Sequence, residues 1–96
     1  MVIKVRLCPP LNNSAGQERV RLVVPGGATV GVILNDLARH FGAEFRHHLF
    51  DTQERVIPAW CAFINGDPIR LNRPENLDTV VYDDDELVLL LNIAGG

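Results

Sequence analysis

The sequence ends in two glycines, Gly95 and Gly96, shortly after a strongly apolar segment. Glycine has no Cβ atom, so such a pair can pass through a narrow channel and adopt backbone conformations closed to other residues. The carboxylate of Gly96 is ionised at neutral pH, because an α-carboxyl group has an ordinary pKa of about 3.3–3.7. It can attack the α-phosphate of a nucleotide to give an acyl-adenylate, from which sulfide or a persulfide can displace AMP and leave a thiocarboxylate. Gly96 is therefore the candidate reactive residue, at the end of a flexible tail formed with Ile93, Ala94 and Gly95.

Other residue types that carry out catalysis are sparse and poorly spaced. Ser14 is the only serine, and it stands among turn-forming residues without the surroundings of a catalytic triad. Gly26 and Gly27 lack the lysine and the hydroxyl residue of a phosphate-binding loop. The three aspartates at 83–85 are more typical of a hydrated turn than of a cation site. We therefore expect the chain not to be an enzyme by itself.

Cysteines and histidines do not occur at the short spacings of a metal site. Cys8 and Cys61 are far apart in the sequence, and the first residues do not resemble a secretion signal, so we expect free thiols in the cytoplasm. His47 and His48 are adjacent, which is more typical of a solvated or helix-end pair than of metal ligands. His40 is expected near a helix end, as a partner of the helix dipole. No metal site is predicted.

Composition narrows the class of partner. The 96 residues are 47% hydrophobic and 22% charged, which is typical of one globular domain. The apolar runs are far shorter than the roughly 20 residues of a membrane helix. A net charge of −3, with a single lysine and scattered arginines, argues against nucleic-acid binding. We expect a protein that is monomeric when free and binds neither membranes nor nucleic acid.

The spacing of apolar residues predicts the elements that position the tail. Val30, Ile33, Leu34, Leu37, Ala38 and Phe41 recur at helical spacing and predict a helix over 30–41, capped by Thr29 and ended by a left-handed Gly42. Phe45, Leu49 and Phe50 predict a short helical turn with buried anchors. Residues 12–16 and Asn65-Gly66 predict turns. Alternation and apolar runs predict strands over 2–7, 18–24, 60–64 and 86–92, with a short return strand at Ile69 and Leu71.

The order of these elements predicts the fold. Leu87–Leu91 is apolar on both faces, as a central strand would be. A final strand in the centre must lie parallel to the first one, because a helix crossover separates the two strands of the first hairpin from the rest. We therefore predict an α+β protein with the ubiquitin-like β-grasp fold: a mixed sheet of four to five strands with one main helix packed across it. The domain is expected to span 1–92, with the tail at 93–96.

The end of the chain resembles a known family. Asp83–Val88 followed by Ile93–Gly96 is similar to the closing signature of the ThiS/MoaD family of ubiquitin-like sulfur carriers. Upstream similarities to its longer bacterial and archaeal members, such as the carrier of thiocarboxylate-dependent cysteine synthesis, lie at Phe45-Arg46, Leu49, Ile64–Arg70 and Leu77–Thr79. Two residues depart from the pattern. Asp84 stands where the family usually has glycine, and Asn92 stands where a proline is common.

The resemblance implies a division of labour between this chain and its partners. An E1-like enzyme would supply the ATP and Mg²⁺ site and adenylate Gly96, so this chain needs no tightly bound cofactor of its own. A biosynthetic enzyme would then accept the sulfur. Cysteine precursor, molybdopterin, the thiazole of thiamin and a sulfur-containing secondary metabolite are all open as products, with the cysteine type slightly favoured by the upstream similarities.

The docking surface for such partners is predicted from the last strand. Its residues alternate between the two faces of the sheet, and only one set can pack on the helix. Counting back from the tail as in the family places Val88 and Leu90 on the open face, with Arg6 and Cys8 on the same face of the neighbouring strand. We call these four residues the docking face. An exposed apolar patch with a charged rim is typical of a partner-binding surface.

Two other functions are compatible with the same residues. A ubiquitin-like modifier would join Gly96 to protein amines by an isopeptide bond. A β-grasp interaction module would use the open face while its tail stays chemically inert, since chain ends are commonly frayed.

Overall fold

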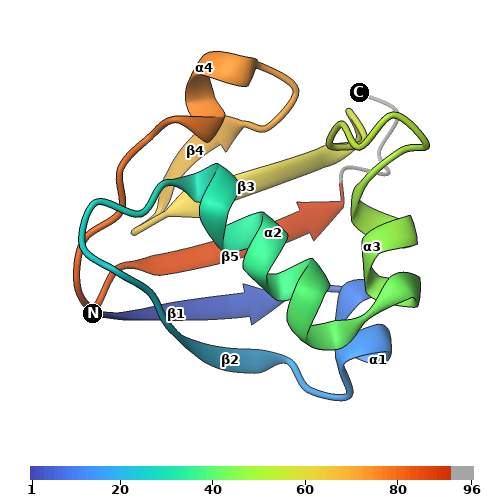
Figure 1. Ribbon diagram of the computed structural model, residues 1–96, viewed down its shortest axis with the longest axis horizontal. Helices are drawn as coiled ribbons and strands as arrows, with labels where there is room; N and C mark the ends of the chain where they lie inside the picture. Colours follow the sequence, from blue (N-terminus) through green and yellow to red (C-terminus); the bar gives the residue numbers. More distant parts are fainter. Residues whose placement is uncertain (92–96) are drawn as a thin grey trace.

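A five-stranded mixed sheet, crossed on one face by the main helix, forms the body of the protein (Figure 1). It is seen in a computed structural model that describes residues 1–91. The elements in chain order are β1 (Val2–Leu7), α1 (Leu11–Ala15), β2 (Arg19–Val23), α2 (Val30–Phe41), α3 (Ala43–Leu49), β3 (Trp60–Ile64), β4 (Asp67–Arg70), α4 (Pro74–Leu77) and β5 (Glu86–Leu91). The strands lie in the order β2-β1-β5-β3-β4, which confirms the predicted β-grasp architecture.

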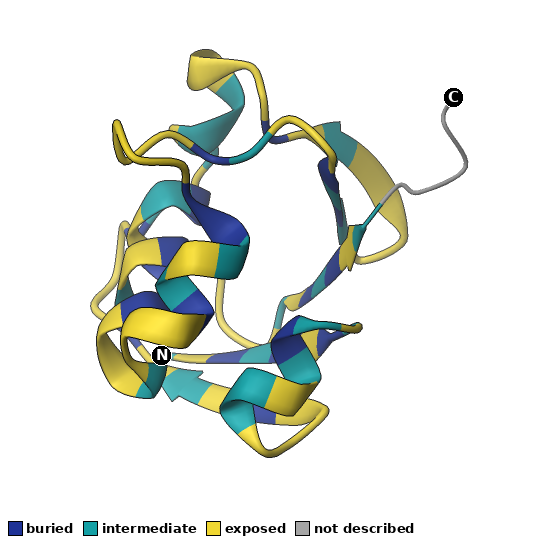
Figure 2. Ribbon diagram, turned by 90° about the vertical axis from the view of Figure 1, so that its right-hand side faces the viewer, coloured by how far each residue is buried: buried dark blue, intermediate teal, exposed yellow. Residues whose placement is uncertain are grey.

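The last strand, β5, is the centre of the sheet. It runs parallel to β1, with Val5 opposite Leu87, and antiparallel to β3, with Ala62 opposite Leu89. Leu87 and Leu89 are 1% and 0% exposed because they point towards the helices. Figure 2 shows α2 and α3 on one side of the sheet, and buried and exposed residues following one another along the strands. The prediction of a central final strand parallel to the first is confirmed.

Helix α2 has the bounds that its apolar spacing predicts, 30–41. The side-chain oxygen of Thr29 accepts a hydrogen bond from the amide of Val32 at 3.3 Å, as expected of an N-cap. The buried stripe of the helix consists of Val30, Ile33, Leu34, Leu37 and Ala38. This stripe covers the sheet, so the helix and the strands bury each other.

The end of α2 differs from the expected left-handed cap. Gly42 has a positive φ of 97°, but its ψ of −169° is extended. Its amide donates to the carbonyl of Ala38 at 2.9 Å, and its own carbonyl accepts from the amide of Arg46 at 3.1 Å. Gly42 therefore ends α2 and begins α3 at the same residue, and the extended ψ turns the chain into the second helix.

Residues 43–50 form the predicted helical turn with its buried anchors. Phe45 and Leu49 of α3 are fully buried, and Phe50 follows them into the core. Trp60 then fixes the start of β3, because its indole nitrogen donates to the carbonyl of His48 at 2.7 Å. His47 and His48 lie in the last turn of α3, as the helix-end interpretation expected.

The segment after Pro9-Pro10 is a helix rather than the predicted turn. Residues 11–15 form α1, and Gly16, at a φ of 72°, closes it. The asparagines and serine of this segment favour turns by local propensity, whereas the fully buried side chain of Leu11 anchors it to the core. Tertiary burial therefore outweighs weak local preference here. Smaller shifts occur at strand ends: β2 begins at Arg19 rather than 18, and β4 spans Asp67–Arg70, before Leu71.

The two faces of β5 should respond differently to the same truncation. Leu89→Ala removes a fully buried side chain and should lower the free energy of unfolding by about 2–5 kcal/mol. Leu90→Ala, one residue away on the open face, should lower it by less than about 1 kcal/mol. Urea denaturation of both variants measures the difference. Equal losses would mean that the faces of β5 are assigned wrongly.

Candidate functional site

The reactive tail predicted from the sequence, Ile93–Gly96, lies outside the described residues, as does Asn92. The structure does describe the strand that leads to it. Leu91, the last residue of β5, is opposite Trp60 of β3. Trp60 is 2% exposed and held by its indole hydrogen bond, so the chain reaches residue 92 from a firmly packed position.

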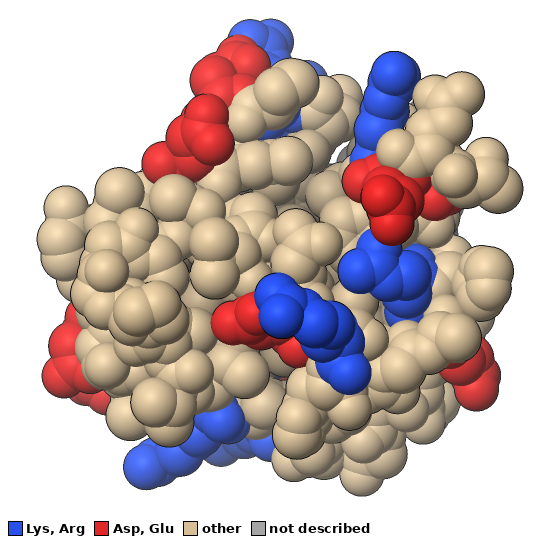
Figure 3. Space-filling view, viewed as in Figure 1, with Lys and Arg blue, Asp and Glu red and all other residues tan. Residues whose placement is uncertain are grey.

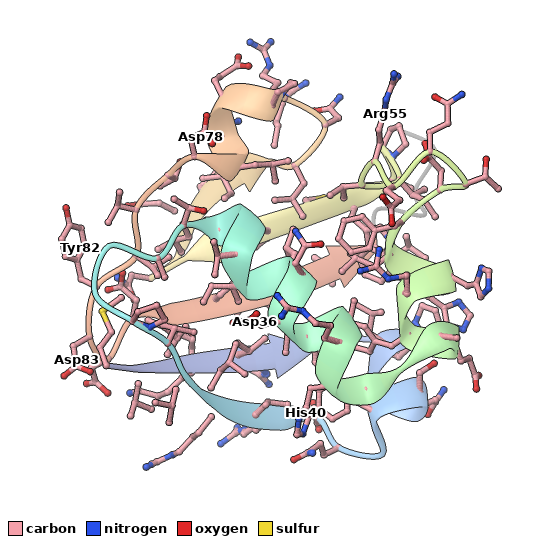
Figure 4. The ribbon with its side chains drawn as sticks, viewed as in Figure 1. Asp36, His40, Arg55, Asp78, Tyr82 and Asp83 are labelled. Carbon is pink, nitrogen blue, oxygen red and sulfur yellow. The ribbon has the colours of Figure 1, made fainter. Side chains whose placement is uncertain are left out.

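The acidic turn before β5 is held by separate hydrogen bonds rather than gathered around one point. Asp83 accepts from the amide of Val2 at 2.8 Å, and Figure 4 shows it at the start of β1. Asp84 lies 3.2 Å from the ammonium of Lys4 and has a φ of 69°, the left-handed conformation expected where the family usually has glycine. The carboxylate of Asp85 accepts from the side chain of Asn65 at 2.9 Å and from the amide of Tyr82 at 2.8 Å.

Asn65 connects this turn to β5. Its side-chain oxygen accepts from the amide of Glu86 at 2.9 Å, while its amide nitrogen donates to Asp85. Both Asn65 and Gly66 have positive φ values, of 50° and 88°, as the predicted tight turn requires. The sequence indicated the turn but not its contact with the start of β5, because the two segments are about twenty residues apart in the chain.

The structure places the four residues of the docking face on the open face, as the alternation of β5 and the family resemblance together predicted. Leu90 is 39% exposed and Val88 is half-buried, on the side of the sheet away from α2. Arg6 of β1 is directly opposite Val88, and the amide of Cys8 donates to the carbonyl of Leu89 at 3.3 Å. The four residues therefore lie together on one face.

Two residues of β3 extend this surface and were not singled out from the sequence. Phe63 is opposite Val88, and Cys61 is opposite Leu90, so both share the open face. Both are half-buried. The alternation of Trp60 and Ala62 towards the core was the signal that would have placed them there. Leu90 thus lies between Cys8 and Cys61, which are both free thiols.

The opposite side of the molecule has a different character. A cavity of about 490 Å³ lies between α2, the 50–58 loop and α4, with Leu34, Phe50 and Leu71 among its lining residues and Arg55 at its rim. Figure 3 shows acidic and basic side chains next to one another on this side, without a large patch of one sign. None of the four residues of the docking face lines this cavity.

Two further features of the described residues bear on the kind of site. Within residues 1–91, no helix combines the length and apolar character that crossing a membrane requires. In the same part of the chain, no three His, Cys, Asp or Glu side chains are placed to hold one metal ion.

Comparison with known proteins places the fold. No family model and no curated protein matches the sequence. Among solved structures, SAMP1 from Haloferax volcanii is 25% identical, with a TM-score of 0.82 over 100% of both chains. The Amycolatopsis orientalis BexX/CysO complex contains a chain that is 26% identical, with a TM-score of 0.72 over 98% of this chain and 99% of that one. A putative molybdopterin converting factor subunit 1 from Pyrococcus furiosus is 16% identical, with a TM-score of 0.73 over 97% and 99%.

These likenesses show that the chain has the ubiquitin-like β-grasp fold of ThiS/MoaD-like proteins. The sequence predicted a particular similarity to cysteine-type carriers, and these comparisons do not confirm it. SAMP1 from Haloferax volcanii has the higher TM-score, 0.82, against 0.72 for the chain of the BexX/CysO complex.

The acidic turn provides a test of the local structure that leads to β5. Asp85→Ala removes an acceptor of two hydrogen bonds and should lower the free energy of unfolding by about 1 kcal/mol. Asp78→Ala is the matched control, because no hydrogen bond or ion pair of the Asp78 carboxylate occurs within residues 1–91. Thermal or chemical denaturation compares the two. A larger effect of Asp78→Ala would contradict the role given to Asp85.

Proposed function

We propose that the chain is a sulfur carrier whose reactive group is the carboxylate of Gly96. The observation that carries the proposal is the placement of β5: the central strand of a ThiS/MoaD-like fold is followed, after Asn92, by the sequence Ile93-Ala94-Gly95-Gly96. A rigid strand gives the tail a fixed starting point. The two glycines without Cβ atoms suit a narrow active-site channel in a partner.

The chemistry follows from the carboxylate. A carboxylate oxygen of Gly96 attacks the α-phosphorus of ATP held by an E1-like enzyme, and pyrophosphate leaves. Sulfide then attacks the acyl carbon, the bond to the phosphate oxygen breaks, and AMP leaves a thiocarboxylate. When the sulfur has passed to an acceptor, water supplies the oxygen that restores the carboxylate. This chain contributes the tail and the surface that positions it, and the partner contributes the ATP and Mg²⁺ site.

The docking face supports the proposal that this chain positions its tail in the active site of a partner. Val88 and Leu90 form an apolar surface on the open side of β5, with the cationic Arg6 beside them. Because the tail follows in sequence the strand that carries Val88 and Leu90, a partner that binds the face also receives the tail. The chain found in a BexX/CysO complex has the same fold and is bound to another protein there, which supports a protein partner for this chain.

A protein modifier is the second candidate. Haloferax volcanii SAMP1, a small archaeal modifier protein, is similar over the full length of both chains. A modifier and a carrier share adenylation of Gly96 and differ in the nucleophile that follows, an amine or sulfide. Among the carrier pathways, we retain the cysteine type on the strength of the upstream sequence similarities. If Gly96 is not activated, the chain acts as a β-grasp interaction module with a chemically inert tail.

The tail is tested by removing its last residue. Deletion of Gly96, or Gly96→Trp, should abolish activation by the E1-like enzyme, because the reacting carbon is displaced or blocked. The melting temperature should be unchanged, since β5 ends before the tail. Intact-mass analysis after incubation with the E1-like enzyme, ATP and sulfide measures the exchange of one oxygen for sulfur in a chain ending at Gly96. An unmodified terminus in that chain under these conditions would overturn the carrier proposal, and larger conjugates would favour the modifier.

The docking face is tested by a charge at its centre. Leu90→Arg should weaken activation about tenfold or more, because a charge then replaces buried apolar area in the complex. Val80→Arg is the matched control: Val80 is 42% exposed, close to the 39% of Leu90, and lies outside the docking face. The dependence of the activation rate on carrier concentration measures docking. Equal rates for the Leu90→Arg variant and the parent would overturn the assigned surface.

A further inference from the structure

The open face carries a cluster of positive charge that neither the tail nor the docking face explains. Lys4 and Arg6 of β1 lie directly opposite Arg21 and Arg19 of β2. A hollow of about 430 Å³ on this face is lined by these four cations and by a single carboxylate, that of Glu86. The chain as a whole is acidic, with a net charge of −3, so the cluster is a local excess.

These cross-strand pairs are costly to the free protein. Like charges directly opposite one another on a sheet destabilise it, by a few tenths of a kcal/mol to about 1 kcal/mol per pair. Lys4 forms an ion pair with Asp84, but Arg6, Arg19 and Arg21 form none within residues 1–91. Within the described part of the chain, three arginines are thus held close together with no ion pair and with only the Glu86 carboxylate in the same hollow, which points to an anionic partner from another molecule.

The backbone of β2 indicates the form of that partner. β2 is an edge strand that pairs only with β1. Met1 and Val24 exchange two hydrogen bonds, so by the alternation of antiparallel ladders Leu22 and Val20 also point their backbone groups towards β1. The backbone groups of Arg19, Arg21 and Val23 therefore face the free edge. Arg19 and Arg21 thus combine a positively charged side chain with unpaired backbone groups. The same edge includes Val23, which is 79% exposed.

We infer that the free edge of β2 binds an extended acidic segment of another protein, which adds to the sheet as a further strand. Residues of the added strand opposite Arg19 and Arg21 are two apart and lie on the open face, so they are Asp or Glu. The residue between them is opposite Val20, and the residue beyond the one opposite Arg21 is opposite the half-buried Leu22; both lie on the inner side of the sheet and are apolar. The preferred segment alternates acidic and apolar residues.

Electrostatic repulsion also disfavours the simplest alternative partner for the β2 edge, which is a second copy of this chain. A second copy of this chain pairing through β2 would bring its own Arg19 and Arg21 close to these arginines. Cationic edge strands are a known protection against such self-pairing. An acidic strand removes the repulsion already present between β1 and β2, so it gains from the cluster that repels a second copy.

The test uses the full chain and a short fluorescent peptide that alternates valine and aspartate, followed by fluorescence anisotropy. We expect binding that weakens with salt. The double variant Arg19→Glu/Arg21→Glu should bind about tenfold or more weakly, because two attractive pairs become repulsive. The variant should fold, since its glutamates then face Lys4 and Arg6 as opposite charges. Arg55→Glu/Arg73→Glu, which reverses as many charges on the far side of the sheet, should bind like the parent.

Strand pairing is separated from simple charge attraction by methylating backbone amides of the peptide. Alternate amides of an added strand face β2, so N-methylation of one alternate set should abolish binding and N-methylation of the other set should not. The proposal would be overturned if the two methylated peptides bound equally well, or if the Arg19→Glu/Arg21→Glu variant bound the unmethylated peptide as tightly as the parent. Tighter binding of a single-stranded oligonucleotide to the same arginines would overturn it as well. A chain without Gly96 should bind the peptide normally, so this result is independent of the sulfur-carrier proposal.

Discussion

The structure depends on the central strand, β5, which pairs with a neighbouring strand on each edge and presents side chains to both faces of the sheet. β5 hydrogen-bonds to β1 on one side and to β3 on the other, and it buries Leu87 and Leu89 beneath the helices. Because side chains alternate along a strand, burial of these two leucines obliges Val88 and Leu90 to lie on the opposite face. The apolar docking face is thus a geometric consequence of the core, and its residues need no separate structural element to hold them.

The same constraint explains how much the sequence reveals. Strong periodicity gave α2 its bounds, and the run from 87 to 91 correctly indicated a central strand. Leu87 and Leu89 are apolar because they lie in the core, whereas Leu90 belongs to the open face and is 39% exposed. Alternation placed Val88 and Leu90 on a common face, and the resemblance to the ThiS/MoaD family indicated that this is the open face. The fold and this part of the candidate site were therefore predictable from local patterns combined with the rules of chain connection and, for the open face, with the family resemblance.

Features that depend on contacts between distant segments were not predictable in the same way. α1 forms although its asparagines favour a turn, because Leu11 is buried in the core. Gly42 joins two helices instead of ending one in a left-handed cap. The contacts of Asn65 with Asp85 and Glu86, and the opposition of Arg19 and Arg21 to Arg6 and Lys4, depend on register between strands. Local propensity carries no information about register.

The central position of β5 also makes the fold dependent on the completeness of the chain. Without β5, β1 pairs only with β2 and β3 pairs only with β4, so the sheet separates into two unconnected hairpins. Isolated hairpins are marginally stable in water. During synthesis, the two halves can join only after residue 91 has left the ribosome. A molecule that presents the docking face is therefore one in which β5 has been made and inserted between β1 and β3.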